Sequence, residues 1–195
     1  NVSDEVSASE GQAIAATSNI LASFSGGVQD TTSNLYDTNN TGISTNFSAI
    51  KSEDSDVNVN ITDTAYHANT NNVSVQASVL KAIANATSGT VTVDNAVRIE
   101  GTRTLVTDAL VTTGTKVTAA TALVKITDTA FHANTNNTSI TAATLSGIGN
   151  ATSGTVTVDN AVKITGAQSD VTAAMVTNAS KVTAATAIVN ITDSA

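Results

Sequence analysis

The sequence predicts an α/β solenoid of stacked turns of about 32 residues, each running through a strand, a corner, a second strand and a short helix. Three observations predict this fold: long segments repeat, large rigid residues are scarce, and strand-type and helix-type periodicity alternate within each repeat. Because Thr and Val favour strands and several of the predicted helices are short and Thr-rich, an all-β solenoid is the alternative.

The repeat is the strongest signal. The segment 61–72, Ile-Thr-Asp-Thr-Ala-Tyr-His-Ala-Asn-Thr-Asn-Asn, returns 65 residues later as 126–137, with Phe in place of Tyr. About two-thirds of the positions that follow are also identical, which is far beyond compositional chance. The predicted organisation is one continuous solenoid in four parts: a diverged first unit (1–59), two repeat units (60–125 and 126–190) and the start of a further unit (191–195).

The two ends of the chain resemble each other. Asn1-Val2-Ser3-Asp4 is similar to Asn190-Ile191-Thr192-Asp193, so the chain begins and ends in the same phase of the repeat. We therefore expect either a length of a longer array or a subunit whose ends continue into its neighbours.

The composition suits a narrow interior between stacked turns. The 195 residues include no Pro, Cys or Trp, and only 3% are aromatic. Ala, Val and Ile fit such an interior, whereas Pro would remove a ladder hydrogen bond that the next turn needs. Regularly spaced Val and Ile argue against disorder. The absence of Cys excludes disulfides and Cys-based zinc sites.

Charge and hydropathy exclude several partners. Sixteen acidic and eight basic side chains give a net charge of −8, which argues against nucleic acid and anionic membrane surfaces. No apolar run approaches the roughly 18 residues of a membrane span, so no membrane partner is predicted.

The elements of one turn follow from its periodicity. Thr-x-Thr pairs are predicted to open strands, with alternation clearest over 90–93, and the corner at 94–96 leads to a second short strand. Helical spacing then follows at Val75, Val79, Leu80 and Ile83, at Leu105, Val106, Ala109 and Leu110, and at Val171, Met175 and Ala179. The predicted caps are Gly89 and Gly154 at helix C-termini, and Thr102 or Ser169-Asp170 at N-termini.

The acidic residues that recur with the repeat are candidate calcium ligands. Calcium between turns would offset the repulsion of stacked carboxylates, but Asp at a strand end is also typical of corners in which it accepts backbone N–H bonds. We favour the structural role, and expect no other cofactor. These residues are Asp63, Asp128 and Asp193 at one repeat position and Asp94 and Asp159 at another.

No catalytic residues are predicted. His67 and His132 are one repeat position seen twice, beside Tyr66 and Phe131, and we expect corner packing with a solvated imidazole. The Ser and Thr residues have no Gly-x-Ser-x-Gly context, and no phosphate-binding Gly pattern occurs. The prediction is a protein that is not an enzyme.

The Thr-x-Thr rows, which open at Thr62, Thr90, Thr127 and Thr155, suggest a surface of regular hydroxyls. Such a lattice could bind ordered water or ice, although Asp63 and Asp128 interrupt it, and Thr on exposed strand positions is the plainer explanation. Asn-x-Ser/Thr triplets are numerous, as at Asn72 and Asn137, and signify glycosylation only where the source has that machinery.

The Val/Ile-x-Ile-Thr-Asp-Thr-Ala phrase, with its Ala- and Leu-bearing helical stretch and return to Val-Thr-Val, resembles the tandem repeats of large secreted bacterial cell-surface proteins. Cyanobacterial and proteobacterial adhesin-like proteins carry similar repeats. The resemblance covers 60–195 clearly and 1–59 weakly, and it lacks the calcium-binding nonapeptides of some such proteins. It implies an extracellular or cell-surface structural or adhesive role.

The sequence thus predicts an extracellular structural protein that builds a fibre or layer by head-to-tail stacking with itself, because an uncapped solenoid exposes strand edges. The alternative is a module that binds ice, glycan or calcium on a surface protein.

Overall fold

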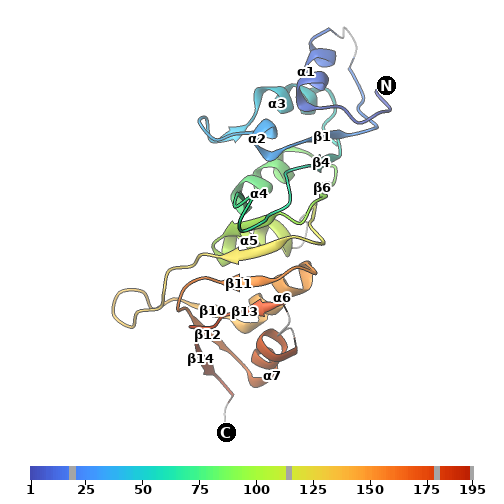
Figure 1. Cartoon of the computed structure of the whole chain (residues 1–195). Coiled ribbons are helices and arrows are strands. Elements are labelled where there is room, and N and C mark those ends of the chain that lie inside the picture. The colour runs from blue at the N-terminus through green and yellow to red at the C-terminus, as the bar shows by residue number, and fades with distance from the viewer. Residues whose placement is uncertain (18–20, 113–115, 178–180, 194–195) are drawn as a thin grey trace.

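The chain is a mixed α/β protein with parallel sheets, in a computed structural model that describes residues 1–17, 21–112, 116–177 and 181–193. The elements follow one another along an elongated molecule, with the N- and C-termini at opposite ends (Figure 1). Seven α-helices and a π-helix lie within the described residues, so the all-β alternative is wrong. None of these helices is long and apolar enough to cross a membrane.

Helices and strands alternate along the chain. The helices are α1 (Ala8–Thr17), α2 (Thr32–Leu35), α3 (Thr45–Glu53), α4 (Ala77–Ala86), α5 (Arg103–Leu110), α6 (Ala142–Ala151), α7 (Gln168–Thr172) and the π-helix η1 (Ala173–Thr177). The strands are β1 (Val28–Asp30), β2 (Tyr36–Asp37), β3 (Gly42–Ile43), β4 (Val59–Ile61), β5 (Ser74–Gln76), β6 (Val91–Val93), β7 (Arg98–Gly101), β8 (Val117–Thr118), β9 (Leu123–Ile126), β10 (Ser139–Thr141), β11 (Val156–Val158), β12 (Lys163–Gly166), β13 (Val182–Thr183) and β14 (Ile188–Ile191).

Three parallel sheets carry the fold. Their strand orders are β1-β4-β6-β8, β5-β7-β9-β11-β13 and β10-β12-β14. Every pairing within them is parallel, and residues that face each other are 24 to 32 positions apart in the chain, as in Ser74 opposite Arg98 and Val59 opposite Val91. Helices between the strands pack on one another in sequence, α4 on α5, α5 on α6 and α6 on η1.

Strand β9 joins the two repeat units. It pairs with β7 of its own unit on one side and with β11 of the next unit on the other. The second sheet therefore contains strands from both units. The chain leaves β9 through the loop 127–138 and begins the third sheet at β10.

The interior is filled by the residues that alternate inward along the strands. In β6 and β11 the two Val residues are buried and the central Thr is exposed, as the alternation over 90–93 predicts. The helices add their apolar faces, and Leu80, Ile83, Leu145 and Ile148 are all completely buried. Large aromatic residues enter the core only in the first 60 residues, as Phe24 and Phe47.

The helix ends differ from the sequence-based expectation. Gly89 and Gly154 are not left-handed caps: the C-cap residues are Thr87 and Thr152, and Gly27 is the described glycine with positive φ. A Cβ added to Gly89 or Gly154 would lie 2.3 or 2.2 Å from a backbone oxygen of the preceding turn. These two positions therefore require glycine because the backbones of two turns meet there.

The N-caps were predicted in part. Thr102 caps α5, its hydroxyl accepting the N–H of Leu105, which confirms that prediction. Ser169 and Asp170 lie inside α7, whose N-cap is Ala167, so that prediction is wrong. Thr62 and Thr127 do not open strands either, since β4 and β9 end just before them and long loops follow.

Candidate assembly interface

The contact between the two repeat units is built on β9 and β11. Val124 and Ile126 of β9 face Val156 and Val158 of β11 in a parallel register. All four side chains are at most 5% exposed, because the pairing places them on the inward face under the helices. One unit is thus joined to the next by strand hydrogen bonds and a buried aliphatic layer.

Strand β14 repeats β9 one unit later, and its environment differs. It pairs with β12 as β9 pairs with β7, but in the described residues no strand lies on its other side. Val189 and Ile191, equivalent to Val124 and Ile126, are 46% and 53% exposed, and Ile188 is 52% exposed. The surface that is buried at the junction of the two units is therefore open at β14.

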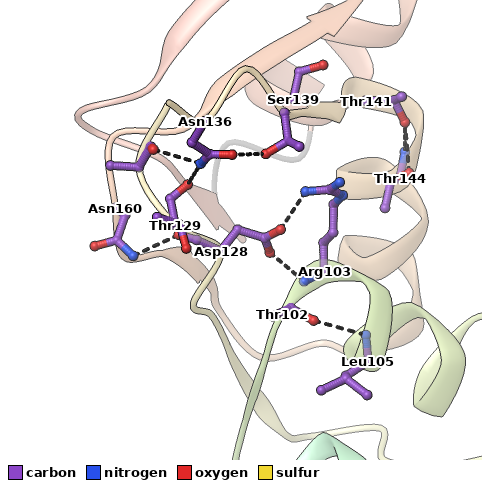
Figure 2. Close-up of polar contacts among 12 residues, drawn as sticks. Thr102, Arg103, Leu105, Asp128, Thr129, Asn136, Ser139, Thr141, Thr144 and Asn160 are labelled. Carbon is purple, nitrogen blue, oxygen red and sulfur yellow. Dashed lines mark hydrogen bonds and ion pairs between the residues drawn. The ribbon is translucent and has the colours of Figure 1, made fainter. Parts of the chain in front are cut away.

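Asp128 connects β9 to a helix of the preceding turn. Its Oδ2 accepts the backbone N–H of Arg103 at the start of α5, and its Oδ1 accepts the guanidinium of the same residue (Figure 2). The Asp128 side chain is 11% exposed. A carboxylate at a helix N-terminus satisfies a free N–H group and interacts favourably with the helix dipole.

The other members of this Asp position make the same contact. Asp63 accepts the N–H and the hydroxyl of Thr32 at the start of α2, at 2.6 and 2.9 Å. Asp193 accepts the N–H of Gln168 at the start of α7, at 2.8 Å. Asp30, which the sequence analysis did not select, accepts the N–H of Ala8 in α1 at 3.0 Å. Each of these carboxylates fastens one turn to the helix of the turn before it.

Asparagines fasten the same corner from the following turn. Asn160 donates to the backbone oxygen of Asp128 (Figure 2). Asn95 likewise donates to the backbone oxygen of Asp63. These side chains were not identified from the sequence, although each directly follows a repeated Asp. Three successive turns thus meet at Asp128, and also at Asp63.

Asp94 and Asp159 lie at a different place, directly after β6 and β11. Their N–H groups donate to the backbone oxygens of Ile61 and Ile126, and their carboxylates face outward. Asp159 lies 3.3 Å from the Nζ of Lys125, while Asp94 has no side-chain partner in the described protein. The structure therefore separates the two Asp positions: one is used between turns and the other faces the surface.

The calcium hypothesis finds no grouped ligand set in the described residues, where no three His, Asp or Glu side chains lie close enough to share a metal ion. Both oxygens of Asp63 and Asp128 already accept hydrogen bonds. The role that the structure gives these carboxylates is therefore the fastening of turns, through helix N-termini 25 or more residues away in sequence.

The two histidines lie in exposed loops. The backbones of His67 and Asn71 exchange hydrogen bonds, as do those of His132 and Asn136, so each loop closes on itself. The Asn136 amide donates to the backbone oxygens of Thr129 and Ala130 (Figure 2). Both imidazoles are exposed, as expected for a solvated corner residue.

The aromatic residues beside these histidines lie against cations of the next turn. The Tyr66 ring lies 4.2 Å from the Arg98 guanidinium and its hydroxyl accepts from the same group, whereas Phe131 lies 5.2 Å from the ammonium of Lys163. The long loop of each unit is thus held over the following turn.

At the N-terminal end, residues 1–6 lie along the segment 23–29. The N–H of Val2 donates to the oxygen of Ser23, and the N–H of Gly26 donates to the oxygen of Val2. Further along, the N–H of Val6 donates to the oxygen of Gly27, as that of Val59 donates to Thr90 and that of Val124 donates to Thr155. Val6, which pairs in parallel with Val28 of β1, therefore occupies the place of Val59 and Val124, while Leu21 nearby is 77% exposed.

No protein-family model, curated protein or solved structure matches this chain.

Proposed function

We propose that the protein is a structural building block: an α/β solenoid whose units stack head to tail into an extended fibre or layer at the cell exterior. The observation that carries the proposal is that β14 is the equivalent of β9 in the next repeat unit. The side chains that β9 buries against β11 are exposed in β14. Head-to-tail stacking reuses an interface that the chain already makes within itself.

The receiving surface is the N-terminal edge of a second copy. Because Val6 takes the place of Val124 beside β1, the equivalent residue Val189 of another copy fits the same place. β14 would then lie along β1 of the second copy, replacing that copy's own residues around Val6. This contact is heterologous, and since its two surfaces lie at opposite ends of an elongated molecule it leads to an open filament.

The expected strength of the contact is modest. Fully burying a Val or Ile side chain contributes about 1.5–3 kcal/mol, and roughly half of each of the three β14 side chains is already covered. About 3 kcal/mol from these side chains, with strand hydrogen bonds in addition, has to exceed the entropy loss of association. Assembly is therefore expected to depend on protein concentration.

The proposed extracellular location rests on the amino-acid composition of the chain. A repeat without Cys and with little aromatic content resembles those of large secreted bacterial surface proteins. The net charge of −8 would keep parallel fibres apart by electrostatic repulsion. A ligand-binding role is the second candidate, and two surface grooves favour glycan as the ligand.

The test is the size of the 195-residue chain as a function of concentration, by analytical ultracentrifugation and electron microscopy. We expect assembly into rods, with Val189→Lys raising the concentration for half-assembly at least about tenfold because it places an ammonium in the buried layer. Val73→Lys is the matched control, since Val73 is 72% exposed and lies outside the surface.

A second variant tests the receiving edge. Removing residues 1–6 frees the edge of β1 beside Val28, so it should lower the concentration for half-assembly. A monomer at every concentration, or equal effects of Val189→Lys and Val73→Lys, would contradict the proposal.

A further inference from the structure

Two surface grooves are related by the repeat. The first is on the outward side of β4 and β6, has a volume of about 270 Å³, and is lined by Asn58, Val59, Asn60, Thr90, Thr92 and Asp94. The second is on β9 and β11, has a volume of about 280 Å³, and is lined by Leu123, Val124, Lys125, Thr155, Thr157 and Asp159. Each residue of the second set lies 65 positions after its counterpart in the first, so the groove is a property of the repeat unit.

The rims of the grooves differ. Glu5, Gly26 and Gly27 complete the first groove, whereas Tyr66 and Arg98 complete the second. Two positions of the floor also change, from Asn58 to Leu123 and from Asn60 to Lys125. The backbone shape is repeated while the charge around it varies.

Several polar groups in the grooves have no hydrogen-bond partner among the residues that the structure describes. The hydroxyls of Thr92 and Thr157 face outward from the strand centres without a partner, and so does the Asp94 carboxylate. The Oδ1 of Asn60 is buried and also unpartnered. The Thr hydroxyls and the Asp94 carboxylate thus lie together as donors and acceptors that a ligand could satisfy, whereas the buried Oδ1 of Asn60 is out of a ligand's reach.

Lys125 gives the second groove a cation held between two carboxylates. Its Nζ lies 3.3 Å from Asp159 and 3.8 Å from Glu100, and an ammonium has three N–H donors. Its ammonium can therefore donate to a ligand oxygen while remaining beside both carboxylates. Arg98 is already engaged with Tyr66, Ser74 and Glu100, so it acts as a support for the groove wall.

We propose that these grooves bind a linear neutral polysaccharide through its hydroxyls, with one subsite per 65-residue unit. Adjacent hydroxyls of a sugar ring can donate to one Asp carboxylate and exchange hydrogen bonds with the Thr hydroxyl, which matches the alternating donors and acceptors of each floor. The volumes are slightly below the roughly 300–1,000 Å³ of drug-sized pockets, which suits one or two sugar rings at a time.

The chemistry of the grooves disfavours other ligands. A single carboxylate with hydroxyls is a poor calcium site, since calcium takes six to eight oxygen ligands. The outward row on the second sheet runs Glu100, Lys125, Thr157 and Thr183, so charged side chains interrupt any flat hydroxyl lattice for ice. Recurrence along the molecule favours a chain-like ligand, because linked subsites raise its overall affinity.

The experiment is affinity electrophoresis in gels containing hydroxyethyl cellulose, with alginate gels in parallel. It uses the Val189→Lys background, so that self-association does not contribute to retardation. We expect retardation by hydroxyethyl cellulose, with the pair Thr157→Val and Asp159→Asn weakening binding about tenfold, and Thr92→Val with Asp94→Asn weakening it less because that groove lacks the ammonium.

Asp170→Asn is the matched control, because it removes the same charge from an exposed site outside both grooves. Circular dichroism melting checks that each variant is folded. A further variant combines all four substitutions, Thr92→Val, Asp94→Asn, Thr157→Val and Asp159→Asn. The proposal is overturned if the parent is not retarded, or if this combined variant is retarded as strongly as the parent. Retardation in alginate gels alone, or thermal hysteresis without retardation, would also overturn it.

Discussion

The unit of residues 61–125 and the unit of residues 126–190 share one backbone plan but do not share one surface. Their buried positions match, as with Leu80 and Ile83 against Leu145 and Ile148, all at 0% exposure. Their outward positions differ: Glu100 becomes Thr165 and Lys125 becomes Asn190. Packing between turns therefore restricts the interior and the corners, while the outer face is free to vary from unit to unit.

The two units also differ in the quality of their helices. α6 contains Gly147 where α4 has Ala82, and α6 is followed by the short α7 and the π-helix η1, whereas α4 is followed by the regular α5. Glycine within a helix is less favourable than alanine by about 1 kcal/mol. We infer that the second unit opens more readily than the first, and substitutions at equivalent positions can measure the difference.

The largest expected effect concerns the glycines that both units keep. Gly89→Ala and Gly154→Ala each place a Cβ within 2.3 Å of a backbone oxygen of the preceding turn, which has no freedom to withdraw. Overpacking of this kind costs about 1–3 kcal/mol, and because backbone is involved the upper end is expected. Urea unfolding followed by circular dichroism measures the loss.

Gly147→Ala is the control for those two substitutions. The nearest atom to its added Cβ is Val111 Cγ1 at 3.4 Å, an ordinary contact. The variant should be more stable than the parent by about 0.5–1 kcal/mol, through helix propensity. If Gly154→Ala were as well tolerated as Gly147→Ala, the close approach of the two turns would be contradicted.

The next effect concerns the Asp residues that fasten the turns. Asp128→Ala should cost about 2 kcal/mol, since a helix cap contributes about 0.5–2 kcal/mol and the Arg103 guanidinium also loses its carboxylate. Asp193→Ala should cost less than about 1 kcal/mol, because Asp193 is exposed and accepts one bond. Hydrogen exchange at the first amides of α5 and α7 reports each loss locally, and an unchanged α5 in Asp128→Ala would refute the role of this carboxylate.

These Asp residues show which features of the structure could be predicted from the sequence and which could not. The repeat, the strands over 90–93 and 155–158, and the cap at Thr102 depend on neighbouring residues, so they could be predicted. The contact of Asp128 with α5 could not be predicted, because its partner Arg103 lies 25 residues away and the contact depends on which strands pair. For the same reason the sharing of β9 between two units and the close approach at Gly154 were not predicted.

The smallest effect concerns a contact that one unit has and the other lacks. Lys81 of α4 pairs with Asp108 of α5, while the equivalent positions in the second unit are Ser146 and Ala173. The two side chains are 41% and 32% exposed, so solvent screens the pair and a coupling of about 0.2–1 kcal/mol is expected. A double-mutant cycle with Lys81→Ser and Asp108→Ala measures it, and the coupling should shrink at high salt. A coupling above about 2 kcal/mol, or one that salt leaves unchanged, would mean that surface charge, rather than helix composition, separates the stabilities of the two units.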